Sequence, residues 1–168
     1  MAKTGLKKVL FSESDFPDVK IGLVFTEWNN LIIEALRTAC IDNLVSNGIK
    51  PENIISLEVP GSFELPLGAK ILMEQNKIQA VICLGCVIKG ETSHDEHINR
   101  AVSSGIMQLS IFSNLPVIFG VLTTNNEAQA KERACGKKGN KGEEAAIAAL
   151  KMIRIKQSIT QAKKKIGY

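Results

Sequence analysis

Residues 80–94 read AVICLGCVIKGETSH, an apolar run followed by a glycine break and then a histidine. Residues 80–88 are almost all apolar and rich in β-branched side chains, a pattern typical of a strand covered on both faces of a parallel sheet. After Gly90, hydroxyl residues precede carboxylates by three positions, as at the start of a helix. The stretch predicts a central strand whose carboxyl end leads into a helix beginning near His94.

The start of that helix is a favourable position for an anion. The N–H groups of a first helical turn lack helical partners, and the helix dipole adds positive potential there. Open α/β sheets also bind their ligands at the carboxyl ends of their strands. We therefore expect His94 to stand beside a phosphate-binding position.

The rest of the chain predicts three further strands, each followed by a helix. The strands are expected at 20–25, 54–59 and 117–122. Ser62 is predicted to cap the helix after the second of these, and two helices follow the last strand, at 127–134 and from about 142. The order β-α-β-α-β-α-β-α-α with short connections predicts a three-layer, flavodoxin-like α/β fold with a four-stranded parallel sheet flanked by helices.

Length and composition bound the class of protein. With 168 residues, 45% of them hydrophobic, the chain is the size of one domain. Residues 1–19 are expected to form an N-terminal arm that needs a neighbouring chain to become ordered, and residues 20–168 a single α/β domain. No apolar run approaches the ~20 residues that span a bilayer, and residues 1–8 lack the apolar segment of a secretion signal. We therefore expect a cytoplasmic protein without a membrane partner.

The four cysteines are expected to be reduced thiols. Cys83 and Cys86 are three positions apart on a predicted strand, so their side chains point to opposite faces of the sheet. Cys40 and Cys135 lie in helical patterns far from one another in the sequence. This arrangement predicts neither a disulfide framework nor a cysteine metal site.

The charge of the chain is unevenly distributed. Residues 131–168 contain 11 Lys+Arg and 3 Asp+Glu, whereas residues 1–130 contain 10 and 14. A basic segment is one feature of nucleic-acid binding, but the chain has only one Trp and one Tyr for base stacking, and its basic residues are spread over helical turns. We favour a solvated helix face with a few anion-binding members and expect no nucleic-acid partner; a basic scaffold that binds nucleic acid is the alternative.

Residues of unusual chemistry follow the predicted strands. They are Trp28, then Ser62, Phe63 and Glu64, then Glu91, Thr92 and His94, and finally Thr123 and Thr124. Since the carboxyl ends of parallel strands meet at one edge, these residues predict a ligand site there. The chain lacks the glycine spacing of a dinucleotide or P-loop motif, and His94 and His97 have no partner cluster for a metal.

Four patterns are ordered along the chain. They read VPGSFELP at 59–66, LGCVIKGETSH at 84–94, FGVLTT at 119–124, and ERA at 132–134 with GNKGEEA at 139–145. Together they resemble the 6,7-dimethyl-8-ribityllumazine synthase family over residues 20 to about 155. The resemblance implies condensation of 5-amino-6-(D-ribitylamino)uracil with 3,4-dihydroxy-2-butanone 4-phosphate, releasing phosphate and water, without a metal or organic cofactor.

The resemblance also implies roles for individual residues. His94 takes the position of the proton-transfer residue. The implied substrate-binding residues are Trp28, Ser62, Phe63, Glu64, Cys86, Val87, Ile88, Glu91, Thr92, Phe119, Arg133, Lys141 and Glu144. Among them, Trp28 stacks on the pyrimidine, Phe119 lines the pocket, main-chain groups of 86–88 contact the ring, and residues 62–64 hold the ring and ribityl chain. Residues 91–92 and Arg133 bind phosphate, with Lys141 nearby and Glu144 as an orienting group.

In the family the site lies between adjacent subunits of a pentamer. By resemblance, Phe119 and Arg133 would come from the neighbouring chain. The segment from Arg133 to Lys141 carries no insertion relative to the family pattern, so a pentamer, a decamer and a closed 60-subunit shell all stay open. A non-catalytic flavin- or pterin-binding module of the same fold is a second hypothesis, but only the enzyme needs His94, Arg133 and Lys141 together.

Overall fold

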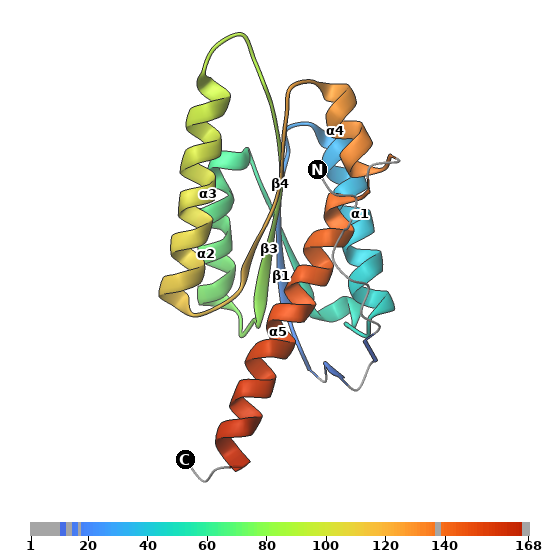
Figure 1. Cartoon of the computed structure of the whole chain (residues 1–168), viewed down its shortest axis with the longest axis vertical. Helices are drawn as coiled ribbons and strands as arrows, with labels where there is room; N and C mark the ends of the chain where they lie inside the picture. Colours follow the sequence, from blue (N-terminus) through green and yellow to red (C-terminus); the bar gives the residue numbers. More distant parts are fainter. Residues whose placement is uncertain (1–10, 13–14, 17, 137–138, 166–168) are drawn as a thin grey trace.

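The chain forms one parallel sheet of four strands in the order β2-β1-β3-β4 (Figure 1). This arrangement comes from a computed structural model, which describes residues 11–12, 15–16, 18–136 and 139–165, with side chains through residue 162. The strands are β1 (Ile21–Thr26), β2 (Ile54–Val59), β3 (Ala80–Ile88) and β4 (Val117–Thr124). The predicted central strand is therefore confirmed, because β3 pairs with β1 on one side and β4 on the other.

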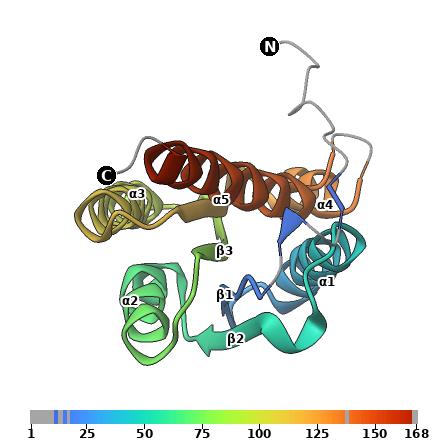
Figure 2. The same ribbon diagram turned by 90° about the horizontal axis from the view of Figure 1, so that it is seen from below.

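Helices cover both faces of this sheet. On one face lie α1 (Asn30–Ser46), α4 (Glu127–Ala134) and α5 (Lys141–Lys165), and on the other lie α2 (Leu65–Gln75) and α3 (His94–Ser113) (Figures 1 and 2). Short 3₁₀ turns, Pro51–Asn53 and Ser62–Glu64, precede β2 and α2. The predicted three-layer α/β fold and its order of elements are confirmed.

Alternation along β3 explains why both faces are covered. Ile82, Leu84 and Cys86 belong to the core beneath α1 and α5, whereas Val81 and Cys83 belong to the core beneath α2 and α3. Successive strand residues point to opposite faces, so an unbroken apolar run needs a helical layer on each side. This split also confirms the opposite directions expected for Cys83 and Cys86.

Two local details differ from the prediction. β4 continues to Thr124 instead of ending at Leu122, because Thr123 and Thr124 pair with Val87 and Ile88 of the long central strand. Ser62 does not cap α2, which begins only at Leu65 after the 3₁₀ turn. The N–H group of Gly61 instead donates to the Glu64 carboxylate at 3.0 Å, which fixes this turn.

Part of the predicted N-terminal arm belongs to the core of its own chain. Phe16 and Val19 are buried against α1 and α5, and the Phe11 ring lies 5.2 Å from that of Phe16. The arm predicted to need a neighbouring chain covers residues 1–19, and of these residues 1–10, 13–14 and 17 lie outside the described residues.

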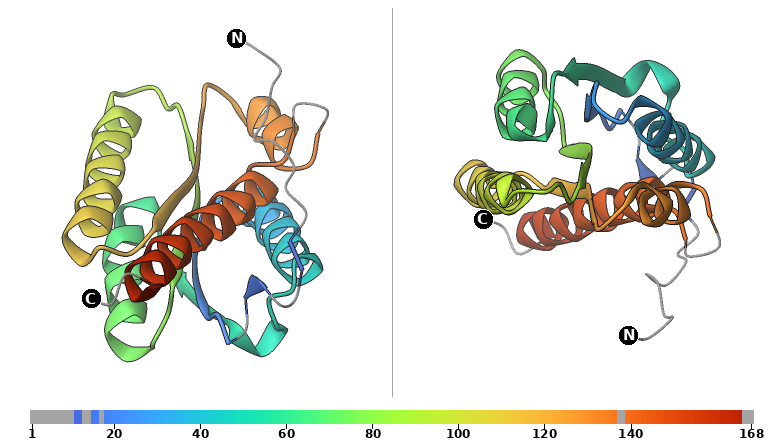
Figure 3. Two further views of the ribbon diagram at one scale, coloured as in Figure 1. Left: turned by 60° about the horizontal axis from the view of Figure 1, so that its bottom comes forward. Right: turned by 90° about the horizontal axis from the view of Figure 1, so that it is seen from above.

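Helix α5 crosses the sheet diagonally (Figure 3), and it continues beyond the lower edge of the sheet in Figure 1. Its first half is buried through Ala146, Ala149, Leu150 and Ile153. Exposed apolar side chains, Met152, Ile155 and Ile159, lie from its middle onward. Among the described helices, none combines the length and the apolar character required to cross a membrane.

Candidate active site at the carboxyl edge of the sheet

The carboxyl ends of the strands meet at the upper edge of the sheet in Figure 1. Trp28 follows β1 with 73% of its surface exposed, and Phe63 follows β2 with 58% exposed. The turns that carry them are neighbours, because a Cβ built at Gly61 would lie 3.7 Å from Trp28 Cδ1. Two large aromatic side chains are thus offered to solvent at one edge, as the sequence predicted.

The turn after β1 is fastened to the central strand. Asn29 adopts a left-handed backbone conformation, and its carboxamide donates a hydrogen bond to the Cys86 carbonyl at 3.0 Å. The buried Thr26 hydroxyl donates to the Trp28 carbonyl at 3.4 Å. These two contacts position Trp28, and sequence reasoning had assigned no role to either residue.

The backbone of β3 has an open edge beside Trp28. The pairing of β1 with β3 ends at Phe25 and Leu84, whereas β3 continues to Ile88. Val81 and Lys89 donate their N–H groups to the β4 side, and backbone groups alternate in direction along a parallel strand. Cys86 and Ile88 therefore direct their backbone groups toward the β1 side, where the strand pairing has ended.

Val87 has the opposite orientation to its two neighbours. By the same alternation its backbone is directed toward β4, and its half-buried side chain packs on the core beneath α2 and α3. Cys86 contributes a buried thiol, and burial raises its pKa to about 11. The thiol is therefore protonated at neutral pH, so the chemistry that Cys86 offers to a ligand is that of its main chain.

Ser62 is buried against the central strand. A Cβ built at Gly85 would lie only 2.8 Å from Ser62 Oγ, so the absence of a side chain at 85 lets the serine approach β3. Glu64 is half-buried and holds Gly61, as described above. Residues 62–64 thus form a fixed turn beside Trp28 with one exposed aromatic ring.

His94 is the first residue of α3 and is exposed. Its backbone N–H donates to Thr92 Oγ1 at 3.4 Å, and the exposed Glu91 precedes this turn. The expected helix start is confirmed. Phe119 lies lower in β4, half-buried against the core beneath α2 and α3.

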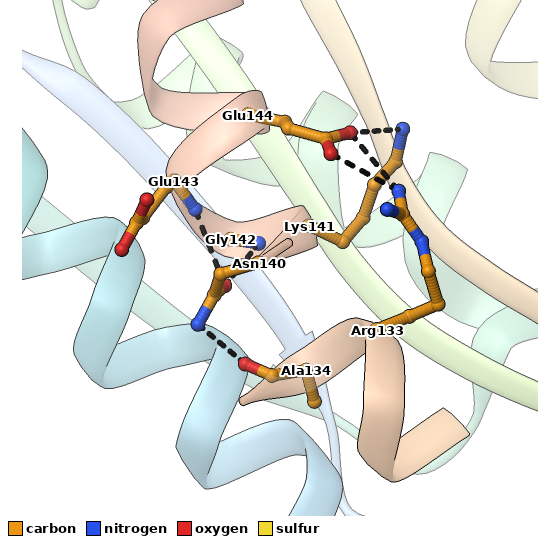
Figure 4. Close-up of polar contacts among 7 residues, drawn as sticks. All are labelled: Arg133, Ala134, Asn140, Lys141, Gly142, Glu143 and Glu144. Carbon is orange, nitrogen blue, oxygen red and sulfur yellow. Dashed lines mark hydrogen bonds and ion pairs between the residues drawn. The ribbon is translucent and has the colours of Figure 1, made fainter. Parts of the chain in front are cut away.

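Arg133, Lys141 and Glu144 form an ion-paired group, called here the basic cluster (Figure 4). Arg133 Nη2 lies 3.1 Å from Glu144 Oε1 and 3.2 Å from Oε2, and Lys141 Nζ lies 3.4 Å from Oε2. The three side chains are 33, 29 and 31% exposed, so they are sheltered but reachable. Two cations share one carboxylate, which leaves a net positive charge suited to an anion.

The sheet separates the basic cluster from His94. Arg133 lies in the last turn of α4, and Lys141 and Glu144 lie in the first turn of α5, on the face opposite to α3 (Figures 1 and 2). The structure therefore places most of the predicted site residues in two groups, one around Trp28, the turn 62–64 and the edge of β3, and the other at the α4–α5 junction. Glu91, Thr92 and His94 lie at the start of α3, and Phe119 lies in β4 on the same face as α3.

No group of three or more metal-ligating side chains is found among the described residues. Sequence reasoning also missed Asn140, whose carboxamide joins α4 to α5 beside the basic cluster. Its signal was present, because asparagine directly before a helix is a preferred cap.

A parallel sheet with polar and aromatic groups at its carboxyl edge defines the class of open α/β proteins that bind ligands at strand ends. The model of the 6,7-dimethyl-8-ribityllumazine synthase family matches residues 18–157, and the chain belongs to this family. The expectation from the sequence motifs is thereby confirmed.

Curated relatives cover most of the chain. The 6,7-dimethyl-8-ribityllumazine synthase of Cytophaga hutchinsonii is 54% identical over 132 residues, covering 79% of this chain and 83% of that protein. The Porphyromonas gingivalis protein of the same name is 48% identical over 140 residues, 83% of this chain and 87% of its own. That of Christiangramia forsetii is 40% identical over 161 residues, 94% and 96% of the two chains.

Proposed function

We propose that the protein condenses 5-amino-6-(D-ribitylamino)uracil with 3,4-dihydroxy-2-butanone 4-phosphate to give 6,7-dimethyl-8-ribityllumazine, phosphate and water in riboflavin biosynthesis. The observation that carries this proposal is membership of the family over residues 18–157, with relatives named for this synthase. These names favour a transferase over the flavin- or pterin-binding module, for which the comparisons give no support.

The uracil is held at the edge around Trp28. The exposed indole provides a flat apolar surface for stacking on the pyrimidine. The Cys86 N–H and the backbone groups of Ile88, on the side of β3 that β1 no longer covers, supply donors and an acceptor for the ring edge, while the Cys86 carbonyl holds Asn29. Ser62, Phe63 and Glu64 are placed to hold the ring and the hydroxyls of the ribityl chain.

The phosphate of the second substrate is held by two sources of positive potential. One is the turn of Glu91 and Thr92 at the N-terminus of α3, where the helix dipole favours an anion. The other is the basic cluster, in which Arg133 can exchange its bond with Glu144 for a bidentate bond with phosphate.

The separation of these groups supports a site built by two chains. One chain supplies Trp28, the turn 62–64 and His94, and its neighbour supplies Arg133, Lys141, Glu144 and Phe119. Head-to-tail contacts of this kind close into a ring. We propose a homopentamer, free or as a multiple of up to 60 subunits, that acts in the cytoplasm without metal or organic cofactor.

His94 moves protons during the reaction. The 5-amino group attacks the ketone carbon and water leaves to give an imine; loss of a C3 proton then allows the C4–O bond to break and release phosphate, which leaves an enol at C3 and C4. The enol takes a proton at C4 and becomes a C3 ketone, and the ribityl-bearing nitrogen attacks this carbon and closes the ring with loss of a second water. General acid–base help at such steps is typically worth ~10² to 10⁴ in rate, and holding both substrates together can supply more.

The proposal is tested by mixing the purified protein with both substrates and following phosphate release and lumazine absorbance together. Turnover should exceed the spontaneous rate measured without protein, and the two signals should rise in equal molar amounts. A rate equal to the spontaneous one would overturn the proposal.

A further inference from the structure

The geometry of the basic cluster depends on two separate helices. Arg133 is in the last turn of α4, whereas Lys141 and Glu144 are in the first turn of α5. A shift of one helix end relative to the other would move the guanidinium away from the ammonium group. The position of Arg133 is therefore only as well fixed as the junction between α4 and α5.

Asn140 bridges this junction with one carboxamide (Figure 4). Its Nδ2 donates to the carbonyl of Ala134, the residue after Arg133. Its Oδ1 accepts from the N–H groups of Gly142 at 2.8 Å and Glu143 at 3.4 Å, the two residues between Lys141 and Glu144. The bridge thus joins the residues that adjoin all three members of the cluster.

The α5 end of the bridge is itself fixed in place. A Cβ built at Gly142 would lie 2.0 Å from the Leu36 carbonyl oxygen, so the start of α5 packs directly on the backbone of α1. Gly139, just before Asn140, has φ +95°, a left-handed conformation that glycine adopts without strain. Asn140 therefore links the end of α4 to the start of α5, which is held in place by its packing on α1.

Few side chains can replace this carboxamide. It satisfies one of the final carbonyls of α4, which lack helical partners, and two first-turn donors of α5. Aspartate accepts but does not donate, and serine caps a helix but is too short to span the junction. Asparagine combines both functions.

We propose that Asn140 is a positioning residue for phosphate binding, acting through Arg133 and Lys141 without touching the substrate. This inference rests on the proposed function. Loss of the bridge lets Arg133 turn away, so the affinity for phosphate falls while that for the uracil is unchanged.

The test compares Asn140→Ser with Asn126→Ser. Asn126 caps α4 through its Oδ1 and the Gln129 N–H at 2.9 Å, so the control makes the same substitution at a second cap that lacks a bridge to Ala134. Inorganic phosphate is titrated by calorimetry, and KM is measured for each substrate. We expect Asn140→Ser to weaken phosphate and raise the KM of the phosphate-bearing substrate by about 10-fold, the scale of one charge-assisted hydrogen bond, with the uracil KM within twofold of the parent.

The outcomes separate the two proposals. If the parent turns over and Asn140→Ser binds phosphate like Asn126→Ser, the positioning role is wrong and the enzyme remains. If the parent binds phosphate without turnover and Asn140→Ser loses that binding, the positioning role stands and the proposed function falls. Equal loss of affinity for both substrates in Asn140→Ser would also overturn the positioning role.

A second variant, Asn140→Asp, tests the inference if Asn140→Ser folds poorly. Asn140→Asp keeps the cap and loses the donation to Ala134, and its added charge is screened at high ionic strength, where the Debye length falls to about 3 Å at 1 M salt. The weaker phosphate binding should persist there relative to the parent at the same salt. Full recovery at high salt would mean that only charge mattered and would contradict the inference.

Discussion

Arg133 and Glu144 are joined by two hydrogen bonds, from one guanidinium nitrogen to both carboxylate oxygens, at 3.1 and 3.2 Å. The guanidinium is thereby held at the α4–α5 junction before any anion arrives. Because Lys141 shares the same carboxylate, a phosphate that enters the cluster competes with Glu144 for two cations at once.

Replacing Arg133 should change the KM of the phosphate-bearing substrate without changing that of the uracil. Arg133→Ala removes a bidentate donor, and charge-assisted hydrogen bonds are worth about 1.5–3 kcal/mol, so we expect roughly a 10- to 100-fold rise in KM for the phosphate-bearing substrate. The uracil KM should stay near that of the parent. Arg133→Lys should rescue poorly, because an ammonium group lacks the planar fork. Similar losses for both substrates in steady-state kinetics would contradict the assignment.

Neutralising Glu144 should tighten phosphate binding. Glu144→Gln keeps an oxygen that accepts from Arg133 but removes the negative charge that competes with phosphate. We expect inorganic phosphate to inhibit about 3- to 10-fold more strongly, the effect of one screened charge at close range. The matched control is Glu143→Gln, one residue earlier and exposed. Unchanged or weaker inhibition in Glu144→Gln would show that the carboxylate does not compete.

His94 should affect rate more than affinity. His94→Gln is expected to slow turnover by about 10- to 100-fold, at the lower end of general acid–base effects, with both KM values near the parent and activity above the spontaneous rate. His97→Gln provides the control, since it lies one turn later on the same helix and is also exposed. Parent-like turnover of His94→Gln from pH 6 to 8 would rule out proton transfer by this residue.

Rings assembled from chains of two different variants should regain activity if each site is formed by residues of two chains. When His94→Gln and Arg133→Ala chains are unfolded together in equal amounts and refolded, about one interface in four should combine an intact His94 with an intact Arg133 in a randomly filled ring. Turnover should then exceed the mean of the two separate variants. Light scattering should report a pentamer or a multiple of it. A rate equal to that mean, or an active monomer, would point to a site within one chain.

The thiols should differ in reactivity. Burial raises the pKa of Cys40 and Cys83 to about 12 and that of Cys86 to about 11, so below these values the thiols stay protonated. At pH 8 less than about 1% of each is thiolate, the reactive form, whereas Cys135 is exposed. A disulfide reagent should therefore modify one thiol per native chain and four after unfolding. Cys135→Ser should abolish the native reaction.

The layers of the fold followed from the sequence because hydrophobic period and length are local signals. The apolar run at 80–88, rich in β-branched side chains, is typical of a strand covered on both faces, and Gly90 with the hydroxyl and acidic residues after it predicted a helix start near His94, where α3 begins. The extension of β4 to Thr124 was not predictable in this way. Threonines end or continue a strand according to the partner beside them, and here the partner is the long end of β3.

Motifs in the sequence propose the members of the candidate site, but they do not give its arrangement. Motifs identified Trp28, His94 and Arg133, yet nothing local states that α3 and α4 lie on opposite faces of the sheet. The contacts of Asn29 with Cys86 and of Asn140 with Ala134 join segments through side-chain hydrogen bonds, which leave no periodic trace in a sequence. Within one chain, the separation of His94 from Arg133 by the sheet therefore followed only from the topology.

The early end of β1 affects which amino-acid substitutions the end of β3 can accept. Past Leu84, the groups that β3 presents toward Trp28 are peptide N–H and C=O groups, which every residue except proline carries alike. The side chains at 86 and 88 can therefore be substituted according to the packing of the core that they fill, while the pattern of N–H and C=O groups offered to a heterocyclic ring stays the same. Only proline at these positions, or a change that lengthens β1 by two residues, would erase it.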